Sequence, residues 1–146
     1  MRTIRLFTCA ALALVAFAVP LPADTPDWVN YQGVLRDASG APRNGNIDMT
    51  FRFFNGSSEG AEILVDRHLA GGTGAVLVST GLFSVPLGSG AVSDGGTVLP
   101  GDPHTTLASV FREFPDVWMQ IEIAIGGPTE VLVPRVQVQA IPYAHK

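Results

Sequence analysis

Apolar and polar residues alternate with a period of two along most of the chain. In segment 46–54, every second residue from Ile47 to Phe53 is apolar, and the residues between them are polar. Segment 117–125 repeats this alternation from Val117 to Ile125. A strand with such a pattern turns one face to the core and the other to solvent. The two segments are therefore predicted as the central strands of the core.

Five further segments have the length and composition of strands. They are segments 29–35, 62–68, 75–79, 82–87 and 131–140. Turn sequences rich in Gly, Asn and Asp separate them, and these residues tolerate the positive φ of tight turns. About seven short strands, with a turn about every ten residues, predict an all-β fold, namely a single antiparallel β-sandwich.

Two segments depart from the alternation. In segment 105–114 four apolar residues recur at helical spacing, Thr105 or Thr106 can cap the first turn, and Pro115 stops it. A short helix that closes one end of the sandwich is therefore expected there. Segment 87–103 is rich in Gly, Ser, Asp and Pro, and it is expected to be a surface loop.

The first residues have the order of a secretory signal. Arg2 and Arg5 precede an apolar stretch, residues 6–19, that contains no charged residue. This stretch is shorter than the about 20 apolar residues that a membrane anchor needs. Residues 1–23 are therefore predicted to be a cleavable signal peptide.

The small-residue rule allows cleavage after Ala18 or after Ala23, and Ala23 is favoured because two prolines end the apolar helix just before it. The mature domain then spans residues 24–146. It is expected to be secreted, periplasmic or at the cell surface, without insertion into a membrane.

Composition restricts the chemistry of this domain. Cys9 is the only cysteine, so the mature chain has neither disulfides nor thiolate metal ligands. Seven Lys and Arg remain against thirteen Asp and Glu, which gives a net charge of −6. Nucleic acid is excluded as an expected partner, because binding it requires clustered cations.

Candidate catalytic and metal residues are few. His68, His104 and His145 show no metal-ligand spacing, and His68 and His145 are expected to be exposed. Asp94, Asp102 and His104 could hold a metal or support hydrolysis from the loop, but they are interpreted as turn formers. No catalytic residue, metal ligand or cofactor is assigned.

Exposed aromatic residues remain as candidates for binding, because they can stack on sugars or anchor a partner. Trp28 and Tyr31 lie near the mature N-terminus, and Trp118 points away from the core residues of its strand. The alternative favoured for Trp118 is that it covers the outer sheet face. These three residues are the predicted binding surface.

Four landmarks occur in order along the chain. They are Asn30-Tyr31-Gln32-Gly33-Val34-Leu35 followed by Asp37-x-x-Gly40-x-Pro42, then Met49-Thr50-Phe51-Arg52-Phe53, Gly81-Leu82-Phe83-Ser84-Val85, and Pro134-Arg135 with Ile141-Pro142-Tyr143-Ala144. As a set they resemble a β-sandwich module of secreted bacterial proteins that precedes stalk-like or tail-fibre-like regions. The opening strand and turn are also similar to transthyretin-like and carboxypeptidase-regulatory-like sandwiches. The resemblance implies a structural module without a catalytic activity.

The landmark residues themselves are interpreted as determinants of the fold. Gly33 and Gly81 suit a bulge or a close backbone approach, and Pro134 marks an edge strand or a bulge. Arg135 is expected to pair with an acid of a neighbouring strand, such as Glu122 or Glu130.

The sequence favours an exported, non-enzymatic structural or adhesive interaction module. Self-association through exposed strand edges or a surface partner is the expected mode of binding. The first alternative is a carbohydrate-binding module that uses the exposed aromatics on a glycan. The second is a secreted hydrolase built from the Asp94, Asp102 and His104 loop.

Overall fold

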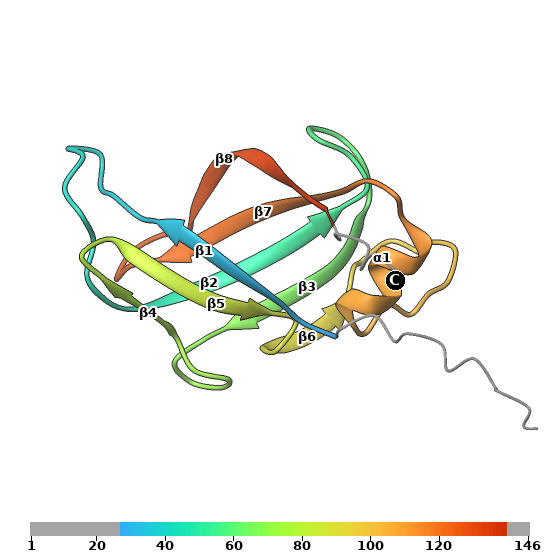
Figure 1. The fold of residues 1–146 in the computed structure, drawn as a ribbon, viewed down its shortest axis with the longest axis horizontal. Coiled ribbons are helices and arrows are strands. Elements are labelled where there is room, and N and C mark those ends of the chain that lie inside the picture. Colours follow the sequence, from blue (N-terminus) through green and yellow to red (C-terminus); the bar gives the residue numbers. More distant parts are fainter. Residues whose placement is uncertain (1–26, 140–146) are drawn as a thin grey trace, which may run out of the picture.

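The computed structural model describes residues 27–139, so the predicted signal sequence and His145 lie outside the described residues. Within this range the chain forms eight strands and one short helix, as expected for an all-β fold (Figure 1). The elements are β1 (Val29–Val34), β2 (Gly45–Phe54), β3 (Glu62–His68), β4 (Val76–Ser79), β5 (Leu82–Leu87), β6 (Ala91–Asp94), α1 (Leu107–Glu113), β7 (Val117–Ala124) and β8 (Glu130–Val138).

The long strand β2 belongs to two antiparallel sheets. Its first residues, from Gly45 to Ile47, pair with β4, and the rest pair with β3 on one side and β7 on the other. The first sheet therefore has the order β1-β5-β4-β2, and the second has the order β8-β7-β2-β3-β6. The two sheets face each other as the layers of a sandwich (Figure 1).

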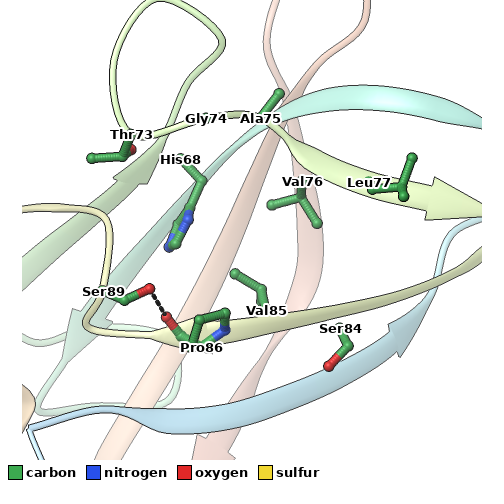
Figure 2. Close-up of a pocket in the computed structure, with 10 residues that line it drawn as sticks. All are labelled: His68, Thr73, Gly74, Ala75, Val76, Leu77, Ser84, Val85, Pro86 and Ser89. Atoms are coloured by element: carbon green, nitrogen blue, oxygen red, sulfur yellow. Dashed lines mark hydrogen bonds between the residues drawn. The ribbon is translucent and has the colours of Figure 1, made fainter.

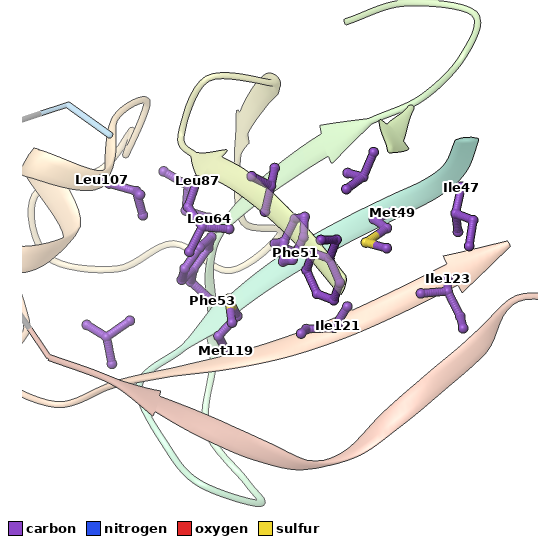
Figure 3. Packing of buried hydrophobic residues seen from close by; sticks show 14 of the residues in the cluster. Ile47, Met49, Phe51, Phe53, Leu64, Leu87, Leu107, Met119, Ile121 and Ile123 are labelled. Atoms are coloured by element: carbon purple, nitrogen blue, oxygen red, sulfur yellow. The ribbon is translucent and has the colours of Figure 1, made fainter. Parts of the chain in front are cut away.

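The alternating apolar residues fill the space between the layers (Figure 3). Phe51 and Phe53 of β2 are fully buried and meet residues of β7 such as Met119. Leu87 of β5 contributes from the opposite sheet. Burial of such side chains is the main stabilising term of the fold, because each contributes about 1.5–3 kcal/mol. The period-two prediction of both central strands is confirmed.

The predicted helix also forms, with the second of the two candidate caps. The Thr106 hydroxyl accepts a hydrogen bond from the Ser109 backbone N–H, at 3.2 Å, and Phe114 leaves the helical conformation just before Pro115. The helix buries Leu107 and Val110 at one end of the sandwich. The helix has seven residues, and the described part of the chain contains none with the length and apolarity of a membrane span.

The prediction of one loop across segment 87–103 is wrong. Four of its residues, Ala91–Asp94, form β6 and pair with residues from Leu64 to Arg67 of β3. The β6 sequence has no alternation of its own, so its extended conformation comes from pairing with β3.

Two landmark residues have the predicted roles in the fold. A Cβ on Gly33 would lie 2.5 Å from the Phe83 ring, so this ring packs over the β1 backbone in the space that a side chain at position 33 would occupy. Pro134 lies on the edge strand β8, where the register against β7 shifts between Met119 and Ile121. Pro134 therefore marks both an edge and a bulge.

Candidate functional site

The outer face of the first sheet carries no charged side chain among its strand residues. Directly paired residues of antiparallel strands share a face, and the outward set of β1, β5, β4 and the start of β2 is exposed throughout. This set, the uncharged face, consists of Asn30, Gln32, Val34, Asn46, Leu77, Ser79, Leu82, Ser84 and Pro86.

Large apolar side chains gather at one end of the uncharged face. Val34 and Leu82 are directly paired and are 59% and 60% exposed, and Leu77 of the neighbouring strand is 66% exposed. Exposed apolar residues on one face mark interaction sites more often than isolated ones do. We refer to these three residues as the apolar cluster.

The outer face of the second sheet is charged, and three of its charged side chains bind one another. Arg52 of β2 donates hydrogen bonds to Glu122 of β7 at 2.8 Å and to Glu62 of β3 at 2.9 Å. Burial lowers the pKa of Arg52, but the hydrogen bonds to Glu122 and Glu62 outweigh this effect, so the pKa is raised. The three side chains connect three neighbouring strands.

Arg135 completes this charged face, but it pairs with no acid among residues 27–139. The prediction of a pair with Glu122 or Glu130 is wrong, because the carboxylate of Glu122 is already bound to Arg52. The Arg135 guanidinium lies 3.5 Å above the centre of the Phe54 ring and donates to the Gly56 carbonyl at 3.0 Å. It covers an apolar ring and ties β8 to the loop after β2.

The structure places the three predicted aromatic residues in separate surroundings. Trp28 precedes β1 and is 60% exposed. Tyr31 points between the sheets, where its ring meets Phe51 and Phe83 with centroid distances of 6.3 and 6.0 Å, and burial raises its pKa. Trp118 lies half-buried on the outer face of the second sheet. They therefore do not form one stacking platform.

A pocket of about 240 Å³ opens where β4 and β5 separate. The two strands pair only at Val78 with Phe83 and at Ser79 with Leu82, and beyond these pairs β4 follows β2 while β5 follows β1. His68 lies between the two separated segments (Figure 2). We call this pocket the slot.

His68 is held at the slot by a fully buried carboxylate. Asp66 and His68 lie on the same face of β3 as the buried Leu64 and point inward, and His68 Nε2 lies 3.0 Å from Asp66 Oδ2. The same oxygen accepts the Gly88 backbone N–H at 2.6 Å. Gly90 packs against the pair, since a Cβ there would lie 2.3 Å from Asp66 Oδ1.

The expectation that His68 is exposed is therefore wrong. A carboxylate and an imidazole two residues apart on one strand pair through Asp66 Oδ2, so both can enter the core, although Asp66 Oδ1 is buried there without a hydrogen-bond partner. The sequence signal was the position of Asp66 and His68 in phase with the buried Leu64. The place of His68 as the last residue of β3 favoured exposure instead.

Asp94, Asp102 and His104 form a second cluster, with their ligand atoms within 4.8 Å of one another. His104 is buried, with Nδ1 at 2.7 Å from Asp102 Oδ1, and its backbone N–H donates to Asp94. Asp102 also accepts the backbone N–H of Leu99. These bonds fasten the loop between β6 and α1, in keeping with the interpretation as turn formers.

The remaining ring nitrogen of this cluster points elsewhere. His104 Nε2 is buried without a partner, and it lies beside Gly101, whose added Cβ would be 3.3 Å away. A metal held between the two carboxylates would use Nδ1, so the unpartnered nitrogen adds no ligand there. The groups are close enough for the hydrolase hypothesis, but none of their described hydrogen bonds involves a serine or threonine side chain.

Fold and site together define an antiparallel β-sandwich with one charged and one uncharged outer face and with a slot that His68 lines. The chain belongs to the family described as a domain of unknown function (DUF8740), whose profile matches residues 30–135. No curated protein and no solved structure gives a significant match to the chain.

Proposed function

We propose that the protein is an exported, non-enzymatic interaction module that associates with a second copy of itself through the uncharged face. The observation that carries the proposal is the separation of charge between the two outer faces. On the charged face Arg52, Glu62 and Glu122 bind one another, whereas the uncharged face presents the apolar cluster to solvent.

Charge favours the uncharged face as the place where two copies meet. A mature net charge of −6 makes two copies repel each other over most of their surfaces. Contact through the uncharged face avoids burying a charged group of its strands, and the cores of protein interfaces are depleted in charged residues. Two such faces related by a twofold axis bury the apolar cluster of each copy.

The test introduces charge at the centre of the apolar cluster. Leu82→Glu is expected to abolish self-association in sedimentation velocity, because it places like charges in the contact. Leu82→Lys alone is expected to weaken it in the same way. A mixture of the two variants is expected to recover a heterodimer, because the introduced charges then complement each other across the twofold axis.

A matched control lies on the other face. Thr50→Glu adds the same charge on the outer side of β2, next to Arg67 and Glu122, and is expected to leave self-association unchanged. A wild-type protein that stays monomeric at millimolar concentration contradicts the proposal. Equal weakening by Leu82→Glu and Thr50→Glu contradicts the choice of face.

The dependence of self-association on salt concentration provides a second test. Because the proposed contact contains no ion pair and the copies repel, raising the salt concentration is expected to tighten self-association by about two- to fivefold. Weakening by salt would instead indicate a contact made by charged residues.

A further inference from the structure

We propose that the slot binds one ring of a neutral saccharide, with His68 as the central hydrogen-bond acceptor. The site differs from the stacking platform expected of the aromatic residues, because it is a concave gap between β4 and β5. The slot adjoins the proposed self-association contact, since Leu77, Ser84 and Pro86 belong to both, but it is centred on His68, whereas that contact is centred on Leu82 in the hairpin pairs.

The tautomer of His68 follows from its contact with Asp66. Asp66 Oδ2 already accepts the Gly88 N–H, so the Nε2 atom of His68 carries the proton that points at it. In this tautomer Nδ1 has a lone pair. No described residue forms a hydrogen bond with Nδ1, and Nδ1 is not fully buried. It is therefore the acceptor that His68 offers to the slot.

The hydroxyl groups of the slot are acceptors as well. Thr73 donates its proton to the Arg67 carbonyl, Ser84 donates to the Asn30 side chain, and Ser89 donates to the Pro86 carbonyl, at 2.7, 2.9 and 2.7 Å. Each oxygen keeps lone pairs for a ligand. Figure 2 shows Ser89 and Pro86 bordering the gap below His68. Because each hydroxyl donates its proton to another group, His68 activates none of them as a nucleophile.

The acceptors and the walls together select the ligand chemistry. Among the described residues, no Asp, Glu, Lys or Arg lines the slot, which disfavours an ionic ligand. Val76 and Val85 give it apolar walls. A saccharide ring has hydroxyl donors around its edge and a C–H face that packs on apolar groups. The volume of about 240 Å³ lies below the range for drug-sized ligands and suits a single ring.

The experiment titrates the full mature protein with D-glucose, D-galactose, D-mannose and N-acetyl-D-glucosamine, and follows backbone amide and imidazole NMR signals. At least one sugar is expected to give saturable shifts at His68, Ser84 and Ser89, with a dissociation constant on the order of 1 mM. Permethylated glucose has no hydroxyl donor and is expected to give none. Absence of saturable shifts with all four sugars, or equal binding of the permethylated sugar, overturns the proposal.

Two variants test the site in the protein. His68→Phe removes the acceptor and is expected to weaken binding at least about tenfold. Ser89→Leu changes an exposed residue at the slot, so it keeps the fold even where His68→Phe does not, and it is expected to weaken binding similarly. Leu82→Glu is expected to retain sugar binding, which separates failure of this proposal from failure of self-association. Unchanged affinity in Ser89→Leu contradicts the assignment of the slot.

Discussion

The outer face of the second sheet carries charged side chains that bind one another, whereas the uncharged face of the first sheet carries none on its strands. Arg52 connects three strands through Glu62 and Glu122, and Arg135 covers Phe54. On the uncharged face, Val34 and Leu82 remain about 60% exposed. The charged face uses its side chains to stabilise the domain, and the uncharged face leaves its side chains available to a partner.

Exposure alone does not distinguish the two outer faces. Trp118 of the charged face is an aromatic residue on an outer strand position, but the residues around it already bind one another. The uncharged face has fewer hydrogen bonds among its side chains than the charged face. One of them runs from the Ser84 hydroxyl to the Asn30 side chain. A face that lacks internal partners can make its contacts with another molecule.

The largest expected effect comes from breaking the charged face. Arg52→Ala leaves the part-buried carboxylates of Glu62 and Glu122 without their cation, and is expected to lower the free energy of unfolding by about 2 kcal/mol in urea titrations. Arg36→Ala removes an exposed arginine that binds only the Gly40 carbonyl, and is expected to cost less than about 0.5 kcal/mol.

A triple variant distinguishes the ion pairs from the packing of the arginine stem. Arg52→Met together with Glu62→Gln and Glu122→Gln removes all three charges, and is expected to recover most of the loss. Self-association is expected to stay unchanged in both variants. A change in self-association as large as that caused by Leu82→Glu would show that the two faces are not independent.

A smaller effect is expected at Arg135. Arg135→Ala exposes Phe54 and removes the bonds to the Gly56 and Glu59 carbonyls, so a loss of about 1–2 kcal/mol is expected in the same titrations. Arg135→Lys keeps the charge without the planar guanidinium group, and it is expected to recover less than half of the lost free energy of unfolding. Full recovery by lysine would show that charge alone accounts for the role of Arg135.

The strands of the two sheets could be predicted from the sequence better than the contacts between their side chains. Alternation in segments 46–54 and 117–125 places one face inward whatever the partner strand is, so both strands were correctly predicted. The partner of Arg135 depends on which strand lies beside β8, and on Arg52 binding Glu122 first. The order and register of the strands, which decide such contacts, are properties of the folded sheet.

The slot was not visible in the sequence for a related reason. It exists because β4 and β5 pair over two residues each and then follow different neighbours. The sequence showed the strong turn at Thr80-Gly81, which favours a longer hairpin. The inward position of His68 was visible in the phase of β3, but only the proximity of Gly88 and Gly90 explains how its carboxylate partner is accommodated.

The smallest expected effect concerns the turn that follows β1, beyond the apolar cluster. The Asp37 carboxylate accepts hydrogen bonds from the Ser39 hydroxyl and from the backbone N–H groups of Ser39 and Ala41. The bond from the Ser39 side chain, followed by that from the Ala41 backbone, lowers the pKa of Asp37 below its usual value of 3.8. The charge therefore serves its own turn and is not directed at a partner.

Because the folded pKa is lowered, this stabilisation is complete above pH 3.8 and is lost as the pH falls through the lowered value. Amide exchange of Ser39 and Ala41 is expected to accelerate in that acidic window, while the strands of the uncharged face keep their protection. Asp37→Asn keeps an acceptor oxygen but cannot titrate, so it is expected to remove the pH dependence. Acceleration that persists in Asp37→Asn would assign the effect to another carboxylate.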